Sequence, residues 1–108
     1  MRRGSIVVVQ EVGTLANKAR PCLIVQNETA LGRTRWVTVC PITSSLTGAT
    51  TIRVPIDPGE GSGLVKQSEI EVDLIFPVKF VSIDRAIGQV SSATMRMVDA
   101  ALKRWLDL

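Results

Sequence analysis

Short runs of apolar, mostly β-branched residues alternate with turn-forming segments along most of the chain. The predicted strands cover residues 5–10, 21–26, 35–41, 50–56, 68–72 and 76–83. The run at 50–56 ends near Pro55, and a proline restricts a strand to the edge of a sheet. Short, evenly spaced strands with no helices between them favour a small β-barrel over a parallel sheet.

In the last segment of the chain the apolar residues recur with a different period. The apolar residues that recur there at helical spacing are Met95, Val98, Leu102 and Trp105. This spacing predicts a helix with one buried stripe that packs on the barrel. Ser91 or Ser92 can cap the helix by accepting a bond from a free backbone N–H. Lys103 and Arg104 lie in its last turns, where the helix dipole favours positive charge.

Three features have a structural interpretation without a function. Glu69 and Glu71 alternate with apolar residues, which predicts a solvated face of a strand. Trp36 and Trp105 are interpreted as core or subunit-interface residues rather than as platforms for stacked bases. The glycine-rich segment 57–63 is a loop that is mobile by composition, and it either closes over a ligand or only connects strands.

Length and composition set the class of protein. The chain has 108 residues, of which 45% are hydrophobic and 21% charged, so residues 1–108 are expected to form a single globular domain. Residues 6–9 are too short for the core of a signal peptide, which points to the cytoplasm and to no membrane partner. Cys22 and Cys40 lie in apolar stretches and are expected to be buried thiols. Two cysteines without a histidine disfavour a zinc site.

Charge is distributed unevenly along the chain. Residues 1–53 contain seven basic and two acidic residues and carry a net charge of +5, whereas residues 54–84 carry −4. A basic first half could bind a polyanion such as a nucleic acid, although the two halves of a sequence need not form separate surfaces.

The absence of histidine limits the available chemistry. No Ser-His-Asp triad, Cys-His pair or two-histidine ribonuclease site can be built. The remaining groups are arginine, lysine, hydroxyl and carboxylate. They suit RNA cleavage, because the 2′-hydroxyl of RNA is itself the nucleophile and the protein needs only to position the chain, move protons and neutralise the phosphate. The fork of donors in arginine matches that phosphate.

Five segments, in order along the chain, resemble the MazF/PemK toxins. Residues 20–27, Arg-Pro-Cys-Leu-Ile-Val-Gln-Asn, are similar to the family's Arg-Pro-x-Leu-Val-x-x-Asn strand. Residues 40–45 resemble its Pro-x-Thr-Ser segment. Residues 3–6 match the Arg-Gly-Asp-Ile opening except at position 5, residues 63–68 resemble Gly-Leu-x-Lys-Asp-Ser, and residues 88–108 are like the family's last helix.

The resemblance implies an SH3-like small β-barrel with a C-terminal helix. It also implies a homodimer that cuts single-stranded RNA, such as mRNA, at specific sequences without a metal ion or cofactor. Attack by the 2′-hydroxyl would leave a 2′,3′-cyclic phosphate and a 5′-hydroxyl. A cognate antitoxin, whose acidic and initially disordered tail occupies the RNA groove, would inhibit the toxin.

The same resemblance assigns roles to particular residues. The catalytic arginine of the family falls on Arg20, as proton donor or phosphate clamp, and its catalytic threonine falls on Thr43, which would hold the scissile phosphate. Asp73 aligns with a carboxylate that the PemK branch uses as a candidate base, Glu71 replaces a neighbouring PemK arginine, and Leu74 stands where glutamine is common. The further implied RNA contacts are Lys18, Ser44, Ser45, Gln67 and Ser68.

Other interpretations stay open. Arg20 could be a solvated surface residue, Thr43 a turn or cap residue, and Asp73 an outward-facing strand residue. The whole chain could be a toxin of the same barrel type that poisons DNA gyrase by binding, as CcdB does. That function is usually tied to a tryptophan-glycine-isoleucine tail, whereas this chain ends Trp-Leu-Asp-Leu at 105–108. It could also be a barrel that has lost activity and binds without catalysis, which the departures at Ser5, Glu71 and Leu74 allow.

Overall fold

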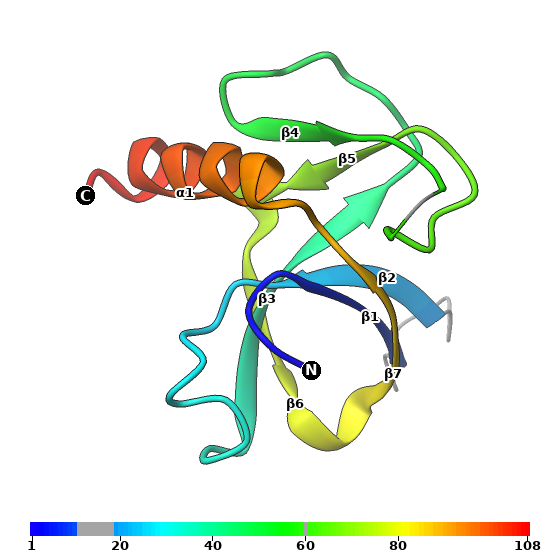
Figure 1. Ribbon diagram of the computed structural model, residues 1–108. Helices are drawn as coiled ribbons and strands as arrows, with labels where there is room; N and C mark the ends of the chain where they lie inside the picture. The colour runs from blue at the N-terminus through cyan, green and yellow to red at the C-terminus, as the bar shows by residue number, and fades with distance from the viewer. Residues whose placement is uncertain (11–18, 60) are drawn as a thin grey trace.

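The computed structural model describes residues 1–10, 19–59 and 61–108, which form seven strands and one α-helix (Figure 1). The strands are β1 (Ser5–Gln10), β2 (Ala19–Ile24), β3 (Trp36–Thr43), β4 (Arg53–Ile56), β5 (Ser68–Glu71), β6 (Phe76–Lys79) and β7 (Ile83–Gln89). The 3-10 helices η1 (Val72–Leu74) and η2 (Phe80–Ser82) separate the last three strands, and α1 (Ser92–Leu106) follows β7.

All strand pairs in the described sheet are antiparallel, in the order β4-β5-β3-β2-β1-β7. The edge of β3 that faces away from β2 is shared: residues 36–39 pair with β6, and residues 42–43 pair with β5. This division bends the sheet strongly, so that the strands curl as in Figure 1. The mainly β fold with a C-terminal helix is the class predicted from the sequence, and β4 is an edge strand as Pro55 indicated.

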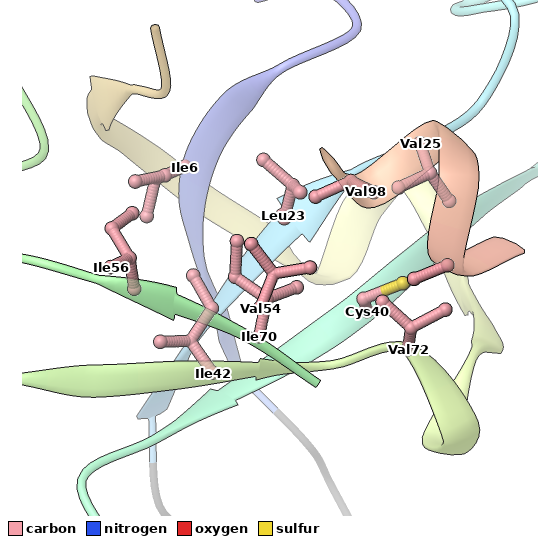
Figure 2. Close-up of a cluster of buried hydrophobic side chains, with 11 residues drawn as sticks. Ile6, Leu23, Val25, Cys40, Ile42, Val54, Ile56, Ile70, Val72 and Val98 are labelled. Atoms are coloured by element: carbon pink, nitrogen blue, oxygen red, sulfur yellow. The ribbon is translucent and has the colours of Figure 1, made fainter. Parts of the chain in front are cut away.

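The central strands are buried on both faces, which explains their continuous apolar runs. One face carries a cluster of Ile6, Leu23, Val25, Cys40, Ile42, Val54, Ile56, Ile70, Val72, Val98 and Ala101 (Figure 2). The other face carries Val7, Val9, Cys22, Ile24, Val37, Val39 and Val78. Cys22 and Cys40 are buried thiols, as expected, and burial raises the pKa of Cys40 to about 12.

Helix α1 covers the first of these clusters. The hydroxyl of Ser91 accepts a hydrogen bond from the backbone N–H of Thr94 at 3.1 Å, which confirms one of the two predicted caps. Val98 and Ala101 are fully buried, but Trp105 is 47% exposed. The core interpretation is therefore wrong for Trp105, and equally for Trp36, which is 49% exposed. Within the described residues no helix is long and apolar enough to span a bilayer.

The predicted strand boundaries around β7 were wrong. The range 76–83 contains β6, η2 and only the first residue of β7, and the rest of β7 was not predicted. The glycine-rich loop packs directly on this strand: the Gly61 carbonyl accepts a hydrogen bond from the Gln89 N–H at 2.6 Å. A Cβ atom at Gly63, where φ is +74°, would come within 2.2 Å of the Ile87 carbonyl oxygen. The described part of the loop is thus held against β7.

Candidate active site at the end of strands β2 and β3

Arg20 and Thr43 lie on neighbouring strands. The ladder between β2 and β3 ends at the pair Cys22–Pro41, and continuing its register by two residues sets Arg20 opposite Thr43. Side chains of directly opposed residues project from the same face of a sheet. Arg20 is exposed and Thr43 is half-buried at the last position of β3. The fold therefore brings to one place two residues that stand 23 positions apart in the sequence.

A cavity of about 220 Å³ lies beside Arg20. Its lining residues are Val9, Arg20, Cys22, Pro41, Leu74 and Phe76. Apart from the guanidinium group and the thiol, these side chains are hydrocarbon. A cation at the rim of an apolar recess can hold a phosphate while the recess takes up a flat, weakly polar group.

Charged side chains continue this face: a row of carboxylates on β5 and η1, and an arginine on β4. Glu69 of β5 is the register partner of Thr43, and Glu71 of β5 is the partner of Arg53 on β4. Glu69 is 5% exposed, and the Glu71 side chain is 13% exposed. The prediction that Glu69 and Glu71 form a solvated strand face is therefore wrong, because Arg53 arrives from β4 and covers them.

Arg53 is the centre of this cluster. Its guanidinium donates to both carboxylate oxygens of Asp73, at 3.0 and 3.2 Å. It also lies 3.4 Å from a carboxylate oxygen of Glu71 and 3.9 Å from one of Glu69. We name Arg53, Glu69, Glu71 and Asp73 the Arg53 cluster. It holds one cation against three carboxylates, so with Arg20 added the face carries no excess of positive charge.

The three carboxylates differ in their surroundings. Glu69 accepts backbone hydrogen bonds from Gly48 and Thr47 at 2.9 and 3.1 Å, and these bonds lower its pKa. The hydrogen bonds from Arg53 lower the pKa of Asp73. For Glu71 burial is the largest effect and raises the pKa, while the nearby charges of Arg53 and Arg20 act in the opposite direction.

The remaining predicted RNA contacts fall at the same end of the sheet. Ser44 and Ser68 line a second cavity of about 320 Å³, together with Lys66. Pro21 and Ile42 also line it, and the ladder places these two on the face opposite to Arg20 and Thr43. Ser45 and Gln67 are exposed nearby in sequence, and Lys18 lies outside the described residues.

The basic first half of the sequence does not form one surface. Arg53 is neutralised within the Arg53 cluster, and Arg3 forms a 2.7 Å ion pair with Asp99 of α1. Arg33 and Arg35 precede β3, whereas Thr43 ends it. A strand of this length separates its ends by roughly 23 Å at 3.3 Å per residue. In the part of the chain that the structure describes, no group of His, Cys, Asp and Glu side chains is arranged to hold a metal ion.

Sequence reasoning missed Arg53 and the role of Glu71. One signal was present: Glu69, Glu71 and Asp73 alternate with apolar residues at period two, so a strand would place three like charges on one face. Such a row needs a buried counter-charge or open solvent. The alternating segment 53–56 begins with the only cation in its neighbourhood, Arg53, and that cation occupies the position opposite Glu71.

Comparisons with known proteins agree on one family. The family described as "PemK-like, MazF-like toxin of type II toxin-antitoxin system" matches residues 2–106. The probable endoribonuclease MazF of Mycolicibacterium smegmatis is 33% identical over 108 residues, covering 100% of this chain and 98% of that protein. The solved structure of Mycobacterium tuberculosis toxin MazF-mt6 superposes with a TM-score of 0.82 at 29% identity, covering 96% of this chain and 97% of the other. At 24% identity, a mycobacterial endoribonuclease in complex with its cognate antitoxin shares the fold, with a TM-score of 0.77 over 100% of this chain and 94% of the other.

Proposed function

This chain belongs to the PemK-like, MazF-like toxins of type II toxin–antitoxin systems, and on that premise we infer that it is an endoribonuclease that cuts single-stranded RNA at the face carrying Arg20 and Thr43. The observation that supports this site is the register between β2 and β3, which when continued beyond Cys22–Pro41 puts Arg20 and Thr43 on one face, with an apolar cavity lined by Arg20. Ser44, Lys66 and Ser68 add polar groups around the same end of the sheet.

The proposed reaction uses the 2′-hydroxyl of the substrate as nucleophile. The 2′-oxygen attacks the adjacent phosphorus, the bond to the 5′-oxygen breaks, and the products are a 2′,3′-cyclic phosphate and a 5′-hydroxyl. Arg20 would neutralise charge on the phosphate and protonate the leaving oxygen, and Thr43 would hold a phosphate oxygen. The proton transfer is downhill, because a guanidinium group is a stronger acid than the alcohol formed from the leaving oxygen.

The partner of a type II toxin is its cognate antitoxin. We propose that the antitoxin inhibits by laying an acidic, initially disordered tail across the Arg20 face, in competition with RNA. We also propose a homodimer. The half-exposed tryptophans at 36 and 105 are large apolar groups of the kind that a subunit interface buries. Light scattering would test the dimer, since a mass equal to one chain contradicts it.

Purified protein incubated with RNA in EDTA tests the function. We expect fragments with 2′,3′-cyclic phosphate ends, and we expect an RNA with a 2′-deoxy sugar at the scissile position to resist. Arg20→Ala should lower the rate by about 10²–10³-fold, the typical effect of removing one charge-stabilising donor. Arg20→Lys should lose most activity too, because lysine keeps the charge without the fork of donors. Arg33→Ala is the matched control and should cut normally, because Arg33 is exposed in the loop before β3, away from the end that carries Thr43.

The outcome separates the alternatives. Intact RNA with well-folded protein would contradict the ribonuclease and direct attention to gyrase binding or to a barrel without catalysis. A strict magnesium requirement would contradict the proposed chemistry, and cleavage by Arg20→Ala near the wild-type rate would place the site elsewhere.

A further inference from the structure

Two of the three carboxylates in the Arg53 cluster are fully engaged. Asp73 has both oxygens hydrogen-bonded to Arg53. Both oxygens of Glu69 accept from the backbone N–H of Thr47, and one of them also accepts from Gly48. A carboxylate held by that many donors is stabilised in its charged form and is a poor proton acceptor.

Glu71 is held differently. Within the described residues its closest ionic contact is the 3.4 Å approach of Arg53, and no hydrogen bond to its carboxylate is seen there. It is also the carboxylate nearest the Arg20 side of the cluster. Continuing the β3–β5 ladder by one residue from Ile42 sets Glu71 opposite Pro41, and Pro41 lines the cavity beside Arg20.

We propose that Glu71 is the general base of the reaction, accepting the proton of the 2′-hydroxyl while Arg20 faces the leaving 5′-oxygen. This inference rests on the proposed ribonuclease function and adds a residue to it. In the resemblance noted above, Glu71 stands where the PemK branch has an arginine and Asp73 stands at its candidate base. In this chain Arg53 holds both carboxylate oxygens of Asp73, and we assign the role of the base to the neighbouring carboxylate of Glu71.

The proton balance closes with these two residues. The 2′-O–H proton passes to the Glu71 carboxylate as the 2′-oxygen bonds to phosphorus. The bond from phosphorus to the 5′-oxygen then breaks, and that oxygen takes a proton from the Arg20 guanidinium. Solvent afterwards removes the proton from Glu71 and returns one to Arg20. Burial raises the pKa of Glu71 above that of an ordinary glutamate, and a higher pKa suits a general base that works near neutral pH.

The first test is Glu71→Gln, which keeps the size of the side chain and removes its basicity. We expect single-turnover cleavage to fall by about 10²–10⁴-fold, with unchanged binding of an RNA that carries a 2′-deoxy sugar at the scissile position. The matched control is Glu28→Gln, an exposed glutamate in the loop before β3. Glu71→Asp keeps a carboxylate and should retain more activity than Glu71→Gln, which guards against a general loss of fold.

The pH profile separates a base from a structural residue. The wild-type rate should rise with pH through an acidic limb and then level off, because the base must lose its proton before it can act. Glu71→Gln should lack this limb, and Glu71→Asp should shift it. A merely structural Glu71 would leave the position of the limb unchanged in both variants.

A substrate with sulfur in place of the bridging 5′-oxygen separates the base from the acid. A thiolate, with a pKa of about 8.5, leaves without a proton donor. This substrate should restore to Arg20→Ala the part of the rate lost with the proton donor, although not the part lost with the phosphate contact, and it should not restore cleavage to Glu71→Gln. If the wild type cuts RNA and Glu71→Gln cuts it at the same rate with the same limb, Glu71 is not the base, and the ribonuclease function stands. If the wild type cuts no RNA, the proposed function itself fails.

Discussion

Replacing Arg53 by methionine should destabilise the whole domain, although no apolar core residue is touched. Methionine fills much of the same space but leaves Glu69, Glu71 and Asp73 facing one another without a cation. Removing one partner of a buried ion pair costs about 3–5 kcal/mol. The Arg53 and Asp73 side chains are each 16% exposed, so some water screens the pair, and we expect the lower end, about 3 kcal/mol. For a domain of this size that corresponds to a fall in Tm of roughly 12 °C or more.

Urea unfolding at several pH values is the appropriate assay. The pKa of Asp73 and that of Glu69 are lowered in the folded state, so their contribution is present above the unfolded values near pH 4 and is lost as the pH falls through the folded values. Glu71 has the opposite sign: its raised pKa favours the folded state at low pH, and this contribution is lost as the pH rises through the folded value. The penalty of Arg53→Met should therefore be largest near neutrality and shrink below about pH 4.

Arg85→Met is the matched control. Arg85 has a shorter contact, 2.6 Å to Asp84, but the two side chains are 63% and 53% exposed. An exposed pair contributes about 0–1 kcal/mol, so this variant should unfold almost like the wild type. If Arg53→Met loses no more stability than Arg85→Met at neutral pH, or if its loss is independent of pH, the charge-balance explanation of the Arg53 cluster is wrong.

Two further predictions concern the glycine loop and the antitoxin. Gly63→Ala should lower the free energy of unfolding by more than Gly59→Ala: both glycines have positive φ, which costs about 1–2 kcal/mol for alanine, but only the Cβ at Gly63 would strike the Ile87 carbonyl. Equal urea midpoints for the two variants would contradict this packing. A synthetic acidic antitoxin tail should release a labelled 2′-deoxy-substituted RNA from the wild type. Simultaneous binding of tail and RNA without mutual effect would show that they do not share the Arg20 face.

The parts of the fold that sequence predicted correctly are those with local causes. β1 coincides with its predicted range because every side chain from Ser5 to Val9 is buried, and α1 follows a capping serine and a helical period. β7 escaped prediction because residues 84–86 are exposed, so the strand is held by its backbone pairing with β1 rather than by an apolar pattern. That pairing joins residues 74 to 84 positions apart, so no local sequence pattern indicates it.

The site residues likewise differ in whether a local pattern identifies them. Arg20 and Thr43 were found through the resemblance of two short motifs, because spacing alone does not reveal that residues on different strands face one another. Glu71 was misinterpreted because alternation along one strand assigns polar residues to solvent. Whether a second strand brings a cation over them depends on the register between β4 and β5, which the intervening loop sets.

The pairing of β1 with β7 also determines at what stage of translation the domain can fold. β1 leaves the ribosome before its partner strand at residues 83–89 and before the helix that covers the Ile6 side of the sheet. At 5–20 residues per second, β1 waits roughly 4–15 s for β7. A nascent chain interrupted anywhere in that interval has an incomplete sheet and an uncovered core. We therefore expect a message cut between the codons of β1 and those of β7 to yield no folded domain.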